Sequence, residues 1–150
     1  MKAVVQRVSR ASVTIEGKVH SEIRSGLLIL LGIEEEDTQE DIDWLSAKIA
    51  KMRIFNDSNG VMNESLIQID GDAIVVSQFT LHASTKKGNR PSYIKAARPE
   101  TAIPLYEKFL LKLESELGKK VGSGEFGADM KVSLLNDGPV TIIIDSKERC

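Results

Sequence analysis

The sequence predicts an α+β fold, a single domain with a mainly antiparallel, barrel-like sheet and two main helices. Apolar and polar residues alternate through the first third of the chain, which is typical of strands. Two later segments, residues 37–52 and 99–117, carry apolar residues at helical spacing instead. The resulting order of strands, helix, strand, helix and strands favours an antiparallel sheet. Because the 150 residues contain no linker and no repeat, we expect one domain over residues 1–150.

Short turns separate the strands of the first third. Residues 16–18 (EGK) and 25–26 (SG) have the composition of hairpin turns. The segment after the second turn is a continuous apolar run, which suits a strand buried on both faces. The strands expected from these patterns are residues 4–9, 12–15, 19–24 and 27–33.

Both helices carry signals for where they begin or end. Asp37 can cap the first helix, and Glu40, three residues later, completes a capping box. Pro99 suits the first turn of the second helix, and Gly118 suits its end. The apolar stripes expected to face the core are Ile42, Leu45, Ile49 and Met52 on the first helix, and Ile103, Tyr106, Leu110, Leu113 and Leu117 on the second.

The segments between and after the helices complete the prediction. A strand is expected at residues 73–79, after the first helix and a loop. Residues 82–98 are rich in Lys, Gly, Asn and Pro and are expected to form an irregular loop. The chain then closes with two strands, residues 132–135 and 140–144, around a turn at residues 136–139.

The composition excludes several classes of protein. A net charge of −2 argues against a general nucleic-acid coat protein. The longest apolar run, residues 27–31, is too short to span a bilayer, and charges at Lys2, Arg7 and Arg10 argue against a signal peptide. The single cysteine, Cys150, allows no intramolecular disulfide and fits a reducing compartment. We therefore expect a cytoplasmic protein with no membrane partner.

No motif for a cofactor or a metal is present in the sequence. A phosphate-binding P-loop and a glycine-rich dinucleotide fingerprint are both missing. The two histidines, His20 and His82, do not have the spacing of metal ligands, and we expect both at the surface or in loops. We therefore expect no cofactor and no metal.

Polar residues follow an apolar strand at residues 77–81 (SQFTL). Ser77 and Thr80 offer hydroxyl groups, Gln78 offers an amide, and backbone N–H groups at this point could hold an oxyanion. The alternative is an ordinary strand end whose hydroxyls satisfy the local backbone. The pattern alone leaves both readings open.

A second polar motif lies at residues 136–141 (NDGPVT). Asn-Asp-Gly-Pro is typical of turns, so a hairpin loop is one interpretation. The other is a cis bond between Gly138 and Pro139, which could aim successive carbonyl oxygens at an ammonium group. Judged from the residues alone, a trans bond is favoured, because only about 5–6% of X–Pro bonds in folded proteins are cis.

The loop expected near residues 82–98 contains a concentration of positive charge. Residues 86–98 carry five basic side chains and no acidic one, which suits contacts with phosphate groups. Within them, Tyr93 could stack on a base or could anchor the loop to the core. A solvated loop without a ligand is the alternative.

Two of these motifs together resemble a known family. Residues 77–81 and 136–141 are similar to the two signature motifs of the D-aminoacyl-tRNA deacylases. Residues 1–8 and 88–93 are also similar to that family, and the resemblance extends from the first strand to Asp145. It implies a homodimeric enzyme of translational proofreading, with active sites at the subunit interface. Such an enzyme hydrolyses the ester between a D-amino acid and the terminal adenosine of tRNA, without a cofactor or metal.

The resemblance also implies roles for individual residues. Gly138-Pro139 would be cis, would enter the partner's site and would receive the substrate α-amino group on backbone carbonyls, while Arg7 would hold this motif in place. An L side chain would meet protein backbone, whereas glycine would escape this exclusion, so glycyl-tRNA is an expected substrate. The tRNA 2′-OH would assist hydrolysis. The expected catalytic residues are Ser77, Gln78, Phe79 and Thr80, and the expected tRNA contacts are Lys86, Lys87 and Arg90.

Three rival interpretations use the same residues. A non-catalytic module could bind tRNA or a small molecule through the same loop and cleft without turnover. A different hydrolase could use Ser77 or Thr80 as nucleophile with His82 as its base. A purely structural protein would leave the two polar motifs without a purpose.

Overall fold

The sheet is built around one long strand, β1 (Lys2–Ile15). The computed structural model describes residues 1–149; Cys150 lies outside the described residues. On one edge, β1 pairs antiparallel with β3 (Gly26–Gly32) and then with β2 (Lys18–Ile23). On its other edge it pairs antiparallel with β8 (Met130–Asp145) along almost its whole length.

Two parallel strands extend the sheet. The strand β6 (Asp72–Ser77) pairs parallel with β3, and the short β7 (Gly122–Ser123) pairs parallel with β6. The parallel pair arises because the chain crosses over through a helix between β3 and β6, as parallel neighbours require. A small hairpin of β4 (Phe55–Asn56) and β5 (Met62–Glu64) lies within this crossover. The predicted α+β fold with a mainly antiparallel, barrel-like sheet is confirmed.

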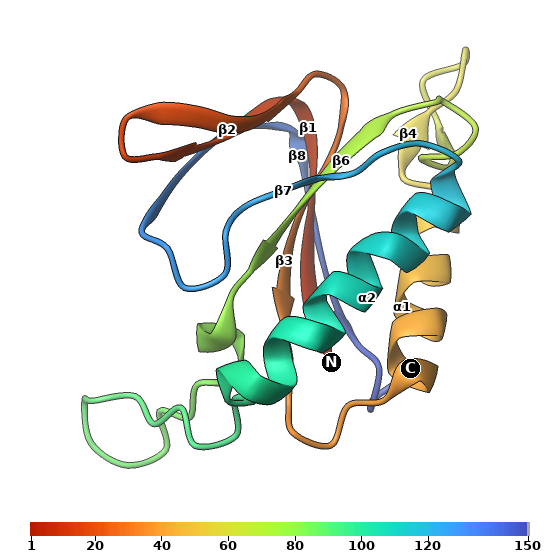
Figure 1. The fold of residues 1–150 in the computed structure, drawn as a ribbon. Coiled ribbons are helices and arrows are strands. Elements are labelled where there is room, and N and C mark those ends of the chain that lie inside the picture. Colours follow the sequence, from red (N-terminus) through yellow and green to blue (C-terminus); the bar gives the residue numbers. More distant parts are fainter. Residues whose placement is uncertain (150) are drawn as a thin grey trace.

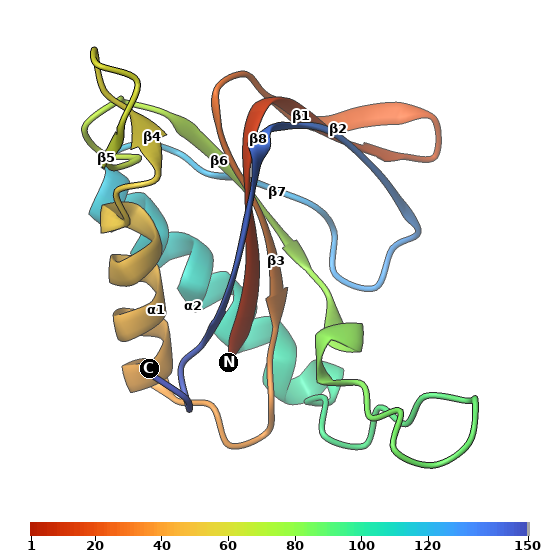
Figure 2. The same cartoon turned by 180° about the vertical axis from the view of Figure 1, so that it is seen from behind.

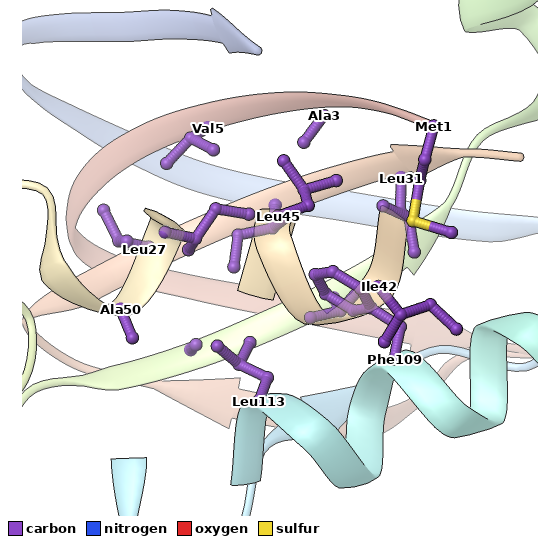
Figure 3. Packing of buried hydrophobic residues seen from close by; sticks show 14 of the residues in the cluster. Met1, Ala3, Val5, Leu27, Leu31, Ile42, Leu45, Ala50, Phe109 and Leu113 are labelled. Carbon is purple, nitrogen blue, oxygen red and sulfur yellow. The ribbon is translucent and has the colours of Figure 1, made fainter. Parts of the chain in front are cut away.

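Two helices cover one face of the sheet, as the sequence predicts. They are α1 (Gln39–Lys51) and α2 (Pro99–Leu117), and they pack side by side (Figures 1 and 2). Apolar side chains from both helices meet side chains of β1 and β3 in the main core (Figure 3). The core residues labelled in Figure 3 are Met1, Ala3, Val5, Leu27, Leu31, Ile42, Leu45, Ala50, Phe109 and Leu113.

No helix among residues 1–149 is long and apolar enough to cross a bilayer.

The buried stripe of α2 is rotated slightly from the predicted one. Ala102 and Phe109 are buried together with the predicted Tyr106 and Leu113. Ile103, Leu110 and Leu117 are only half-buried, on the flank of the stripe. As predicted, Pro99 stands in the first turn and Gly118 ends the helix in the left-handed conformation.

The first helix begins one residue later than predicted. Thr38 is its N-cap, and the Thr38 N–H donates to the carboxylate of Asp41 at 2.9 Å. Asp37 is therefore not the cap. Its buried carboxylate accepts a hydrogen bond from the amino group of Met1 at 2.7 Å, so a tertiary contact replaces the predicted local one.

The predicted C-terminal hairpin is wrong. Residues 130–145 form one strand, because the segments before and after the Asn-Asp-Gly-Pro sequence both pair with β1. Val8 pairs with Asn136 and Gln6 pairs with Thr141, so residues 137–140 lie opposite Arg7 alone. These four residues form a bulge in the middle of β8. The bond between Gly138 and Pro139 within it is cis, in agreement with the family resemblance and against the reading from the residues alone.

Candidate active site

The first polar motif lies where β3 and β6 end. Ser77 is the last residue of β6 and pairs with Leu31 near the end of β3. The strand stops there, two residues before the predicted end, and the Gln78 N–H donates to the Leu31 carbonyl at 2.8 Å. A short 3-10 helix, η1 (Phe79–His82), follows and turns the chain away from the sheet.

The side chains of this motif are partly accessible, as a substrate site requires. Ser77, Gln78 and Thr80 are half-buried, and Phe79 is exposed. The Gln78 amide donates to the Thr80 hydroxyl at 2.6 Å. Gln78 and Thr80 are therefore joined at the end of the sheet, next to Ser77.

Tight packing fixes η1 against β3. A Cβ atom on Gly32 would lie 2.9 Å from Leu81 Cβ and 3.1 Å from the Gln78 carbonyl oxygen. Real Cβ atoms essentially never make the first of these contacts, and the second is tighter than nine in ten real Cβ contacts. The absence of a side chain at Gly32 therefore lets η1 approach the sheet, a role that sequence reasoning did not find.

His82 was predicted at the surface or in a loop, but it is buried at the end of η1. Only 3% of the residue is exposed, and Nδ1 lies 3.1 Å from a carboxylate oxygen of Glu34. Among residues 1–149, neither ring nitrogen has a well-aligned hydrogen-bond partner, and none joins His82 to Ser77 or Thr80. This placement does not favour His82 as a base for either hydroxyl.

Tyr106 supports the strand that ends at the motif. Its hydroxyl donates to the carbonyl of Val75 at 2.6 Å, two residues before Ser77. Burial raises the pKa of Tyr106 to about 12. The side chain is therefore a neutral hydrogen-bond donor at physiological pH, and it helps to hold the end of β6 on α2.

The second polar motif is held by Arg7. The guanidinium group is buried, and Nε donates to the Asp137 carbonyl at 3.0 Å. On its other side, Nη1 donates to the Ile54 carbonyl at 2.9 Å. Arg7 thus joins β1, the chain before β4 and the bulge of β8. Asp137, Gly138 and Pro139 remain exposed in that bulge.

The two motifs lie at different places on the sheet. The bulge of β8 faces Arg7, which pairs with Leu27 at the beginning of β3, whereas Ser77 pairs with Leu31. Four residues along β3 correspond to about 13 Å, and the three strand spacings from β8 to β6 add about 14 Å across the sheet. One chain therefore does not bring Gly138-Pro139 to its own Ser77.

The basic loop, which contains residues 86–98, projects from the end of the sheet that carries η1 (Figures 1 and 2). Its base is closed by reciprocal backbone hydrogen bonds between Ser84 and Ser92, at 2.8 and 2.9 Å. The Tyr93 ring packs edge-on against Phe79, with centroids 5.1 Å apart. The loop is thereby attached to the first motif. The basic side chains Lys86, Lys87 and Arg90 are exposed on it.

The similarity of the chain to known proteins is extensive. The sequence profile of the family described as D-Tyr-tRNA(Tyr) deacylase matches residues 4–145. The chain belongs to this family. A D-aminoacyl-tRNA deacylase of Christiangramia forsetii is 74% identical over 149 residues, and one of Bacteroides fragilis is 65% identical over the same length. Each match covers 99% of both chains.

Solved structures agree with this assignment of the fold. A structure of the c-Myc DNA Unwinding Element Binding Protein superimposes with a TM-score of 0.91 at 42% identity, covering 97% of this chain and 98% of the other. A structure described as a probable eukaryotic D-amino acid tRNA deacylase gives a TM-score of 0.84 at 15% identity, with 95% and 97% covered. The activity follows from the family and its full-length relatives: the chain is a D-aminoacyl-tRNA deacylase, a hydrolase of carboxylic ester bonds.

Within residues 1–149, no three or more His, Cys, Asp or Glu side chains are grouped as metal ligands would be. The polar groups available to a substrate near η1 are hydroxyls, an amide and backbone N–H groups. Such groups can orient an ester and stabilise negative charge on its carbonyl oxygen.

Proposed function

We propose that the enzyme proofreads translation by hydrolysing D-aminoacyl-tRNA at sites completed by two copies of the chain. The separation of the two motifs on one sheet carries this proposal. Ser77 and its neighbours from one copy would hold the ester, and Gly138-Pro139 from the other would hold the amino group. All 150 residues would act as a single deacylase domain in the cytoplasm.

One apolar row on the sheet face away from the helices supports association into a homodimer. Ala3 and Val5 face the helices, so Val4 faces the other way. Val4 pairs with Leu30 on one side and with Ile143 on the other, which places three apolar side chains in one row. Ile143 is 74% exposed. Leu135, also on β8, is exposed. Among residues 1–149, β8 pairs with β1 alone, and a long edge strand of this kind favours pairing or packing with another chain.

The proposed selection of chirality is steric. The carbonyl oxygens in the Gly138-Pro139 bulge would accept hydrogen bonds from the substrate ammonium group. Ser77 and the Phe79 N–H would orient the ester, with Gln78 and Thr80 lining the pocket. Once both ends of the amino acid are fixed, an L side chain points at protein backbone and a D side chain points at open space. Glycine carries no side chain to exclude, so glycyl-tRNA is a further proposed substrate.

Hydrolysis is proposed to proceed with help from the tRNA 2′-OH. A protein hydroxyl needs a neighbouring base to become a nucleophile. The Thr80 hydroxyl accepts its hydrogen bond from the Gln78 amide, which cannot take up a proton, and His82 is buried beside Glu34. An RNA hydroxyl next to the ester can instead take part directly. No cofactor and no metal enter this scheme.

The first test compares D-tyrosyl-tRNA with L-tyrosyl-tRNA, using purified enzyme in the presence of a chelator. We expect rapid loss of the D-ester and survival of the L-ester. Cleavage of both would contradict the steric selection, and restoration of activity by added divalent cations would contradict the metal-free scheme.

A binding function without turnover is the alternative, because one structural relative is named for binding a DNA element. The same basic loop could serve such a function. Survival of both esters in this assay, with tRNA or DNA still bound, would favour it.

Lys86, Lys87 and Arg90 are proposed to contact tRNA phosphates. Replacing all three by Ala should weaken tRNA binding and reduce the slope of log K against log salt by about 2 to 3, because each lost phosphate contact changes it by about 0.7 to 0.9. The measurement is the affinity for uncharged tRNA at several salt concentrations. Replacement of Lys51, Lys108 and Lys120, which are exposed on the helical side, is the control with the same change in charge. An unchanged slope in the loop variant would exclude the loop from phosphate binding.

A further inference from the structure

The bulge of β8 needs a support at each of its two ends. Residues 137–140 have no ladder partner on β1, and the three residues at its tip are exposed. Arg7 supports the first end, because its Nε donates to the Asp137 carbonyl at 3.0 Å. The support at the other end comes from Asn136.

The Asn136 side chain closes the neck of the bulge. Its Nδ2 donates to the Val140 carbonyl at 3.0 Å, which joins the residue before the bulge to the last residue of the bulge. The same nitrogen donates to the Arg7 carbonyl at 2.9 Å and so ties the neck to β1. The Thr141 hydroxyl donates to Oδ1 at 3.5 Å. Both protons of the amide group and its oxygen are therefore used within a half-buried site.

These contacts leave Gly138 and Pro139 between two fixed points. Asp137 is held by the guanidinium group of Arg7, and Val140 is held by the amide of Asn136. The packing inside the bulge is close, because a Cβ on Gly138 would lie 3.0 Å from Arg7 Nη2 and 2.9 Å from Val140 Cγ2. Rotation of either end would change the direction of the carbonyl groups between them.

We propose that Asn136 is a positioning residue for the selection of D-amino acids. The inference rests on the proposed function, in which carbonyl groups of this bulge receive the substrate ammonium group. Asn136 does not touch the substrate. It fixes the bulge to β1 and thereby fixes the carbonyl groups that hold the substrate amino group. With the amino group fixed, the direction of the substrate side chain decides whether the amino acid fits. A displacement of about 1 Å in such a group can cost about 100-fold in rate.

Asn136→Asp tests the proposal with little change in shape. The variant puts a carboxylate oxygen where the amide nitrogen donates to two carbonyl oxygens, so attraction becomes repulsion. We expect kcat/KM for D-tyrosyl-tRNA to fall at least about tenfold, and the ratio of D-ester to L-ester cleavage to fall by a similar factor. Asn59→Asp, on the exposed β4–β5 turn, adds the same charge elsewhere and should keep the wild-type ratio.

The ratio separates positioning from a structural role. A variant whose rate falls while the D-to-L ratio stays at the wild-type value would overturn the proposal, as would a variant with wild-type kinetics. If Asn136→Asp does not fold, Asn136→Ala removes the two donated bonds without adding repulsion, and the same ratio is measured. Failure of the wild-type enzyme to distinguish the two esters would instead refute the proposed function, so the two failures are distinguishable.

Discussion

Two inactive variants should restore activity to each other when they are combined in one dimer. Gly138→Val should abolish D-ester hydrolysis, because Gly138 has φ +132° and a Cβ there would meet Val140 and Arg7 at about 3 Å. Ser77→Glu should abolish it separately, because it places a negative charge where the ester is proposed to bind. In a mixed dimer, one site receives both changes and the other receives neither.

The expected recovery has a definite size. Equal co-expression gives heterodimers in about half of the molecules, and one of their two sites is intact, so about a quarter of the wild-type sites are restored. The measurement is D-tyrosyl-tRNA hydrolysis by each variant alone and by the co-expressed pair, with dimer content checked by light scattering. A pair that remains as inactive as its members would mean that each chain builds its site from its own two motifs, against the distances within the sheet.

Local patterns predicted most of the fold, because the elements concerned depend on contacts close in sequence. Glu16 and Gly17 have positive φ at the turn that joins β1 to β2, as the sequence of that turn suggests. The buried Ile42, Leu45 and Ile49 of α1 likewise follow from residue spacing, whereas Met52, predicted in the same stripe, is the half-buried C-cap. The termination of α2 at Gly118 follows from the conformational freedom of glycine.

The errors occur where tertiary contacts override a local preference. Asp37 is a good cap in isolation, but the amino group of Met1 binds its carboxylate, and Thr38 takes the cap. Asn-Asp-Gly-Pro is good turn chemistry, but pairing with β1 on both flanks extends β8 through it. Local patterns carry no information on either partner.

The sequence predicted which residues belong to the candidate site, but not how these residues are arranged in space. The motifs around Ser77 and Gly138 stand out in the sequence, whereas their separation depends on the register of four strands. The support given by Asn136 also depends on that register, because Arg7 must face the bulge for its carbonyl to accept the amide proton. The burial of His82 follows from the docking of η1 on Gly32 and Glu34, which no spacing of residues indicates.

Gly32→Ala should remove most of the activity by moving η1. The added methyl group would lie 2.9 Å from Leu81 Cβ and 3.1 Å from the Gln78 carbonyl oxygen, so the backbone of the motif must shift. We expect a loss of about 100-fold in kcat/KM for D-tyrosyl-tRNA, because about 1 Å of misplacement is enough for such a loss. The free energy of unfolding should fall by about 1–3 kcal/mol, as for other overpacked sites.

Gly122→Ala is the matched control for this change. A methyl group there would meet Ile74 Cγ1 at 3.1 Å and Ser21 Cβ at 3.3 Å, which are side-chain atoms away from η1. Urea unfolding of both variants compares their stabilities, and D-ester hydrolysis at a temperature where both are folded compares their activities. Equal loss of activity in the two would mean that general destabilisation, and not the position of η1, limits the reaction. Selective loss in Gly32→Ala would instead show that the close approach of this turn to β3 sets the geometry in which the ester is held.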